Sequence, residues 1–372
     1  MKYLDEYRDP ECCRRLLAQI RRTVSRPWTV MEVCGGQTHG FLRYGLDQEL
    51  AGCVELIHGP GCPVCVTPLE SIDFAVELAR RGDALVTSFG DMLRVPGSRE
   101  SLMQVRASTG NVQVVYSPLD AVDLARRTPE RQVVFFAVGF ETTTPATALA
   151  VHQAHDLGLT NFSLLVSHVR VLPAMELLAA DPQAGIHGFL AAGHVCTVAG
   201  FDSYVDFSRR HRMPVVVTGF EPVDLLSGVL ECVEQLERGE ARVANRYARS
   251  ARAAGNQPAL GLVADVYEPC DRPWRGLGVV PAGGLRLRAE WATWDAETRF
   301  PRQSQAVSEP PECRSGEVLT GRIKPPQCEC FGVRCTPESP LGAPMVSAEG
   351  ACSAYYRYAV ARRETGSDST RS

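Results

Sequence analysis

The chain has 372 residues, of which 45% are hydrophobic and 22% are charged, so it can bury a core and form two or three domains. Its formal net charge of -4 offers no basic surface for nucleic acid or an anionic membrane, and we exclude both as partners. The N-terminal segment 1–17 is charged and lacks the apolar core of a signal peptide, and no apolar run reaches the roughly 20 residues of a membrane span. We therefore expect a cytoplasmic protein.

Between Pro27 and about Leu236, short apolar runs alternate with helical patterns in which apolar residues are spaced by three and four. This alternation is typical of α/β proteins whose parallel sheets are covered on both faces. We predict two similar parallel-sheet α/β units, in domains 1–118 and 119–236, with the site in a cleft between them. The expected strands are Thr29–Val33, Val54–His58, Ala84–Thr87, Val112–Tyr116, Val133–Val138, Ser163–Val166, Gly188–Ala191 and Pro214–Thr218.

Residues 237–372 form a third region, which is rich in glycine, proline and arginine and shows little periodicity. We expect this C-terminal region to be irregular and to be held together by its cysteines instead of by a large core. The last residues, from Arg362 onward, are predicted to be disordered.

The chain contains fourteen cysteines, and most of them lie in two groups. In a reducing compartment, cysteines grouped in this way indicate thiols and metal ligands and argue against a disulfide framework. One group lies in two loops near the N-terminus, and the other lies between Cys313 and Cys352. The sequence therefore predicts two separate thiol sites.

Cys34 follows the first predicted strand, at the carboxyl edge where open α/β sheets bind their ligands. Gly35 and Gly36 come next; they allow a close backbone approach and leave the sulfur uncrowded. His39 could donate a hydrogen bond, hold a proton or join a coordination sphere, or it could be only a cap or surface partner. Glu32 would point to the same side as Cys34, although a buried carboxylate paired with an arginine is an equal interpretation.

The second loop carries a C-x-x-C motif, Cys62 and Cys65, directly after the second predicted strand. This spacing suits either a reversible disulfide or two ligands of one metal ion, and a merely structural pair is the third possibility. Thr67, Pro68 and Glu70 predict a capping box, with Thr67 as the N-cap of the next helix. Because Cys65 lies just before that helix start, its thiolate would be favoured.

Two further histidines, His168 and His194, follow predicted strands, so they either line the same cleft or serve as caps or surface groups. In the segment GFETTTPATA, Thr144 and Pro145 predict a helix start in preference to a catalytic threonine cluster. Motifs of a standard nucleotide site and of a serine hydrolase are absent.

The C-terminal cysteines could enclose a four-cysteine site made of Cys328, Cys330, Cys335 and Cys352, with Cys313 in reserve. Thiolate-rich sites bind zinc or iron-sulfur clusters. The spacing does not decide between the two, since neither paired C-x-x-C knuckles nor a ferredoxin run is present. Unligated cysteines are the remaining alternative.

Several long motifs of this chain resemble those of the HypD family of nickel-iron hydrogenase maturation factors. They are CGGQTH from Cys34, HGPGCPVCVTP from His58, GFETTTPATA, and the C-terminal KPPxC, CTPExPxG and MVSxEGxCxAYYxY, in the family's order. The resemblance covers nearly the whole chain, from Trp28 to Tyr358.

The resemblance implies a scaffold for the Fe(CN)2CO fragment, an iron that carries two cyanides and one carbon monoxide, before its delivery to the hydrogenase large subunit precursor. The implied partners are a HypC-type chaperone and the cyanide donor HypE, with HypF upstream. Cys34 would hold the iron together with a cysteine of HypC, and Cys62 and Cys65 would be the nearby redox or iron-binding pair. The C-terminal cysteines would hold a 4Fe-4S cluster that passes electrons toward this pair.

The chain departs from the family where Pro344 and Ser315 stand in place of cysteines. The fourth cluster ligand would then be Cys330 or Cys313, or the cluster is altered or absent. The expected ligands that remain are Cys328, Cys335 and Cys352.

A metal-assembly scaffold is the favoured function, in preference to a turnover enzyme. The alternative is a thiol-disulfide oxidoreductase that uses Cys62 and Cys65. A third possibility is an iron-sulfur electron carrier whose α/β units only dock a partner.

Overall fold

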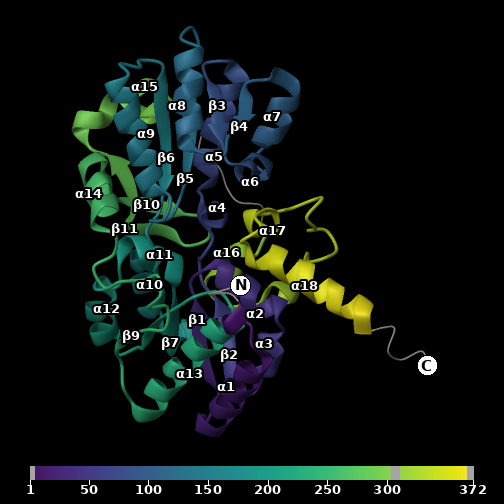
Figure 1. The fold of residues 1–372 in the computed structure, drawn as a ribbon. Helices are drawn as coiled ribbons and strands as arrows, with labels where there is room; N and C mark the ends of the chain where they lie inside the picture. Colours follow the sequence, from purple (N-terminus) through teal and green to yellow (C-terminus); the bar gives the residue numbers. More distant parts are fainter. Residues whose placement is uncertain (1–4, 303–310, 367–372) are drawn as a thin grey trace.

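The computed structural model describes residues 5–302 and 311–366. It is an α/β protein with two parallel sheets, which lie one above the other in Figure 1. Sheet A has five strands in the order β2 (Val54–His58), β1 (Trp28–Glu32), β7 (Gly188–Ala192), β8 (Val215–Thr218) and β9 (Val243–Asn245). Sheet B has four strands in the order β4 (Val112–Val114), β3 (Leu85–Ser88), β5 (Val133–Gly139) and β6 (Phe162–His168).

The predicted fold class and all the predicted strands are confirmed. Every residue of β5 and of β6 is buried, as expected for strands whose two faces are both covered. Strand β9 was not predicted, and it completes one edge of sheet A.

The chain is shared between the sheets in a different order from the predicted domains. β1 pairs with β7 on one side and with β2 on the other, so sheet A contains the first two strands and the later three. In the sequence, all four strands of sheet B lie between β2 and β7. The predicted boundary near residue 118 therefore falls inside sheet B, between β4 and β5, and the sheets do not follow the segments 1–118 and 119–236.

Helices cover the faces of both sheets (Figure 1). Within residues 5–302 and 311–366, no helix has both the length and the apolar character needed to cross a bilayer. The longer helices before residue 240 are α1 (Pro10–Thr23), α2 (Gly35–Arg43), α5 (Leu69–Arg81), α7 (Leu102–Thr109), α8 (Pro118–Arg127), α9 (Thr144–Asp156), α10 (Val171–Ala179), α12 (Ser203–His211) and α13 (Pro222–Arg238). Shorter ones in the same part of the chain are α3 (Leu46–Glu49), α4 (Pro63–Val66), α6 (Gly90–Arg94) and α11 (Gly193–Ala199), and the short helix α15 (Ala296–Arg299) lies later in the chain.

The predicted helix start at Thr144 is confirmed, because α9 begins there and the Thr144 hydroxyl donates to the backbone carbonyl of Glu141. The capping box predicted at Thr67 is wrong. Helix α5 begins at Leu69, and Thr67 instead ends the short helix α4, where its hydroxyl donates to the Pro63 carbonyl at 2.9 Å.

The segment after β9 is more regular than predicted. Strands β10 (Tyr267–Trp274) and β11 (Gly278–Leu287) form an antiparallel hairpin, which helix α14 (Gln257–Val266) precedes. The expectation of an irregular chain is therefore wrong for these residues.

The part of the C-terminal region that follows α15 is irregular and cysteine-rich, as predicted. It contains the short helices α16 (Ser315–Leu319) and α17 (Ala343–Val346) and ends in α18 (Ala351–Gly366), which packs against α2 (Figure 1). Residues 362–366 are helical, so the predicted disorder is wrong for them, and the rest of that tail lies outside the described residues.

One buried apolar cluster joins the two sheets and the hairpin. It contains Val33 after β1, Ile57 on β2, Phe140 after β5, and Trp274 and Val280 of the hairpin. Cys34, Cys62 and Cys65 belong to the same cluster. The fold therefore places the N-terminal thiols in the interior, where the two halves of the molecule meet.

Candidate functional site

Cys34 lies at the carboxyl edge of sheet A, as predicted, where β1 gives way to helix α2. It is the N-cap residue of α2, and its backbone is extended. A Cβ atom on Gly35 would lie 2.1 Å from the backbone oxygen of Glu349, so only glycine permits this close approach of the C-terminal region. A Cβ atom on Gly36 would lie 3.1 Å from the Phe220 ring and 3.6 Å, an ordinary contact distance, from the Cys34 sulfur. Gly35 thus permits the close packing of the C-terminal region, and Gly36 keeps a side chain out of the space between the Phe220 ring and the thiol.

The Cys34 thiol is 2% exposed. Burial raises its pKa well above the ordinary range, and the nearby Glu32 carboxylate adds to this effect, so the group is a neutral thiol at pH 7. A thiolate at this position requires a cation or a proton acceptor beside it. The nearest candidate acceptor is His194, whose Nδ1 lies 3.7 Å from the sulfur.

His194 is the histidine of this site, and the sequence singled it out only weakly. It lies in α11 directly after β7, the strand that neighbours β1, so the strand order brings it to Cys34. Burial lowers the pKa of its imidazole, which is therefore neutral at pH 7 and has a nitrogen free to accept a proton. His39, the predicted site histidine, faces the hydroxyl of Tyr358 at 3.2 Å from its Nδ1.

Cys62 and Cys65 form a disulfide with a Cα–Cα distance of 5.2 Å. Cys62 is the N-cap of α4, and its sulfur accepts a hydrogen bond from the Cys65 backbone N–H at 3.1 Å. Of the predicted alternatives for this pair, the structure contains the disulfide. Both residues are buried, at 2% and 0% exposure.

The two loops lie directly against each other. The Gly35 backbone N–H donates to the Gly61 carbonyl at 3.0 Å, and a Cβ atom on Gly61 would lie 2.3 Å from the Cys34 nitrogen. A movement of the Cys62–Cys65 loop at Gly61 would therefore displace the backbone of Cys34. Among the residues that the structure describes, no three His, Cys, Asp or Glu side chains are arranged as metal ligands.

The side chain of Glu32, the last residue of β1, holds the Cys34 loop in place. Its carboxylate accepts hydrogen bonds from the Cys34 backbone N–H at 2.9 Å and from the Thr38 hydroxyl. An arginine was one expected partner of this buried carboxylate, and that expectation is wrong. The carboxylate instead faces His58, whose Nδ1 lies 2.7 Å away. The other nitrogen of His58 lies 2.9 Å from the hydroxyl of Tyr355 on α18. A buried network thus joins β1, β2 and the C-terminal helix.

His168 is buried in sheet B and takes no part in the Cys34 site. Its Nε2 lies 2.8 Å from the Thr147 hydroxyl, which also accepts a hydrogen bond from Tyr267 at 2.9 Å. Burial lowers the pKa of His168 to about 4. The network ties β6 to helix α9 and to the hairpin.

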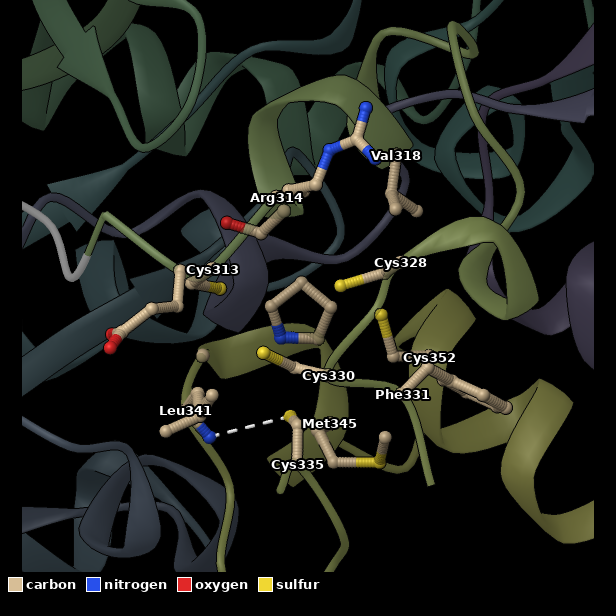
Figure 2. Close-up of a pocket in the computed structure, with 14 residues that line it drawn as sticks. Cys313, Arg314, Val318, Cys328, Cys330, Phe331, Cys335, Leu341, Met345 and Cys352 are labelled. Carbon is tan, nitrogen blue, oxygen red and sulfur yellow. Dashed lines mark hydrogen bonds between the residues drawn. The ribbon is translucent and has the colours of Figure 1, made fainter. Parts of the chain in front are cut away.

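The C-terminal cysteines meet in one pocket (Figure 2). Ser315 and Pro344, the two positions at which the resemblance led us to expect cysteines, line the same pocket without contributing a thiol. The five cysteines that line it are Cys313, Cys328, Cys330, Cys335 and Cys352.

The more buried thiols of the pocket are affected by their neighbours. Burial raises the pKa of Cys352, and the neighbouring thiols Cys313, Cys335 and Cys328 raise it further. Burial raises the pKa of Cys335 as well, and Cys313 and Cys328 add to this effect. Cys330 lies in one apolar cluster with Cys335 and Met345, and Cys328 and Cys352 pack against the same cluster. Cys313 and Cys328 thus lie close enough to act on both Cys335 and Cys352.

Comparison with known proteins gives matches along nearly the whole chain. The family described as HypD, Hydrogenase formation hypA family, matches residues 11–359. A Rhodobacter capsulatus protein named Hydrogenase maturation factor HypD is 48% identical over 97% of this chain and 99% of its own length. The Escherichia coli (strain K12) protein of the same name is 45% identical over 96% of this chain and 98% of its own length. Both thiol regions lie within the matched residues.

Proposed function

Since this chain belongs to the HypD family and takes part in hydrogenase maturation with other components of that machinery, we propose that it is the scaffold for the Fe(CN)2CO fragment. Cys34 holds the iron as a thiolate, shared with a cysteine of a HypC-type chaperone. HypE, with HypF upstream, supplies cyanide, and the finished fragment passes to the hydrogenase large subunit precursor.

The observation that carries the proposal is the surroundings of Cys34. Low-spin iron with cyanide and carbon monoxide accepts a soft thiolate, and Gly36 puts no side chain between the Phe220 ring and the sulfur. His194 can take the proton that the thiol loses when iron binds. Sharing the iron between two proteins lets the fragment leave when the partners separate.

The Cys62–Cys65 disulfide supports a redox step next to this thiol. Its reduction takes two electrons and two protons and yields two thiols, which could then hold iron beside Cys34 or act as the electron source for assembly. Reduction opens a bond in the loop that contacts Cys34 through Gly61, so iron capture and the redox state of the pair are coupled.

A 4Fe-4S cluster fits the donor set of the C-terminal pocket. Four thiolates are the usual ligands of such a cluster, and we assign Cys313, Cys328, Cys335 and Cys352, because Cys313 and Cys328 raise the pKa of both Cys335 and Cys352. The alternative set, with Cys330 in place of Cys313, is the one first predicted from the sequence. When bound, the cluster would supply single electrons for reduction of the disulfide.

Infrared spectroscopy tests the scaffold. The protein is purified anaerobically with a co-expressed HypC-like partner, and cyanide and carbon monoxide stretching bands are recorded. We expect Cys34→Ala to abolish these bands and Cys232→Ala, at a buried thiol on α13, to leave them unchanged. Bands that persist in Cys34→Ala would show that this residue does not hold the iron.

The second candidate is a thiol-disulfide oxidoreductase that uses Cys62 and Cys65, and the closed disulfide is the observation that favours it. Rapid reduction of small disulfides by the isolated protein, with no effect of Cys34→Ala, would support it. The burial of both sulfurs argues against large disulfide substrates, because an attacking thiol needs access to a sulfur atom.

A further inference from the structure

We infer that Tyr355 and Tyr358, which lie one turn apart on α18, are positioning residues for the Cys34 site. Their hydroxyls hold His58 and His39, and these histidines flank the loop that carries the thiol. The C-terminal helix is then a part of the iron site that never contacts the iron. The inference deepens the proposed function, because it rests on Cys34 as the working thiol.

The first chain of contacts runs from Tyr355 to Cys34 through two side chains. The Tyr355 hydroxyl lies 2.9 Å from His58 Nε2, His58 Nδ1 lies 2.7 Å from the Glu32 carboxylate, and that carboxylate accepts the Cys34 backbone N–H at 2.9 Å. Glu32 is 0% exposed, His58 is 3% exposed and Tyr355 is 9% exposed. Because water cannot replace a lost partner at such burial, each contact constrains the next.

The direction of the hydrogen bond to Glu32 follows from the chemistry of the groups. A carboxylate only accepts, so His58 Nδ1–H donates to Glu32. The other ring nitrogen, Nε2, pairs with the Tyr355 hydroxyl, which can donate or accept. Replacing Tyr355 by phenylalanine keeps the ring that packs edge-on against His58 and removes only this hydrogen-bond partner.

A second set of contacts fixes helix α2 from the same side. The Tyr358 hydroxyl lies 3.2 Å from His39 Nδ1, and the two rings meet edge-on. At the start of α2, Gly35 packs directly against the backbone of Glu349, which lies just before α18. The C-terminal region therefore contacts α2 at its first turn and again one turn later.

The geometry also gives α18 a second connection. Cys352 lies one turn before Tyr355 on this helix and lines the C-terminal cysteine pocket. A displacement of α18 at that pocket would move the hydroxyl that holds His58. The two thiol regions thus share one rigid element, and order in the pocket supports order at Cys34.

Thiol alkylation of the full chain tests the inference in the absence of iron and of partner proteins. Because Cys34 is 2% exposed, iodoacetamide reaches it only when the loop opens. We expect Tyr355→Phe to raise the alkylation rate at Cys34 about tenfold, as measured by peptide mass spectrometry. The rate at Cys232, a buried thiol on α13, should not change.

Two further variants complete the design. Tyr356→Phe makes the same chemical change on the same helix, at a ring that packs on Phe331, and should leave the rate at Cys34 unchanged. Tyr358→Phe breaks the half-buried contact with His39 and should raise the rate about threefold, which keeps the test decisive if Tyr355→Phe does not fold.

A spectroscopic signature separates positioning from a general loss of stability. In protein labelled with nitrogen-15 at histidine, the ring signals of His58 should shift in Tyr355→Phe and stay in place in Tyr356→Phe. Equal rates at Cys34 in these two variants would overturn the inference, as would parallel increases at Cys34 and Cys232. Neither result bears on whether Cys34 holds iron, which the infrared experiment decides separately.

Discussion

The loops that carry Cys34 and Cys62 extend from neighbouring strands of sheet A, whereas the cysteines of the C-terminal pocket lie in loops and turns, apart from Cys352 at the start of α18. Backbone hydrogen bonds, buried glycines and the Glu32–His58 pair fix the first region before any ligand binds. The second region has only a small apolar cluster of its own. A thiol site can thus be preorganised by a sheet, or it can depend for its order on the group that it binds.

The largest expected effect separates the proposed cluster ligands from Cys330. After anaerobic reconstitution with iron and sulfide, Cys352→Ser should lose nearly all of the bound iron-sulfur cluster, because Cys352 is buried in the pocket and three neighbouring thiols raise its pKa. Cys330→Ser should retain it. Iron and sulfide content together with visible absorption would measure both. Loss of the cluster in Cys330→Ser and retention in Cys313→Ser would instead favour the ligand set first predicted from the sequence.

The preorganised region should be most sensitive at Glu32. Glu32→Ala removes the partner of His58, of Thr38 and of the Cys34 backbone, and should lower the free energy of unfolding by about 3 to 5 kcal/mol in denaturant titrations. Glu55→Ala is the matched control on the adjacent strand. Glu55 is exposed and pairs with Lys324 at 3.5 Å, so its loss should cost less than about 1 kcal/mol. Similar losses in both variants would contradict a buried anchor.

Acid should weaken the sheet scaffold through His168. Because burial lowers its pKa from 6.5 to about 4, the unfolded chain binds this proton more tightly than the folded chain does. The contribution of His168 to the free energy of unfolding is fully present above pH 6.5 and decreases as the pH falls toward 4. Below that pH it is constant, and the total loss is about 3 kcal/mol. Unfolding curves across this range would show a shallower decrease in His168→Gln. An unchanged pH dependence in that variant would assign the acid sensitivity to another group.

The smallest expected effect concerns the contact between the two regions. Gly35→Ala would force a Cβ atom against the Glu349 carbonyl and should lower the free energy of unfolding by about 2 kcal/mol, as measured by thermal unfolding. Gly261→Ala on α14 has open space around the new methyl group and should be neutral or stabilising by up to about 1 kcal/mol. A neutral Gly35→Ala would mean that the C-terminal region readily moves away from α2.

The sequence predicted the strands well, because fully apolar runs such as β5 have no other stable place than a sheet covered on both faces. It did not predict the hairpin, since Pro269, Pro273 and Pro281 obscure the alternation of buried and exposed residues. The helix start at Thr67 was misplaced because Pro63 begins a separate short helix that uses the threonine hydroxyl. Local signals thus located the buried strands, but they did not decide between two possible helix starts only a few residues apart.

The sequence singled out the thiols of the candidate site, offered His194 only as one of two histidines that could line the same cleft, and missed the pairing of Glu32 with His58. Cys34, Cys62 and Cys65 stand out through their glycine and proline neighbours, which are local features. The partner of Cys34 is His194, and the partner of Glu32 is His58; both pairings depend on strand order within sheet A. Strand order is set by packing of the whole chain, so a pattern in the sequence could not show it.

The strands of sheet A are synthesised in two groups, which are separated by all of sheet B. A ribosome releases β1 and β2 early, yet their neighbour β7 emerges only after all of sheet B, and α18 emerges last. The Cys62–Cys65 motif thus exists in a growing chain long before His194 and Tyr355 can enclose the Cys34 loop. An incomplete chain would have its thiols without their surroundings, and Cys34 would become buried beside His194 and the Glu32 network only after α18 had been made.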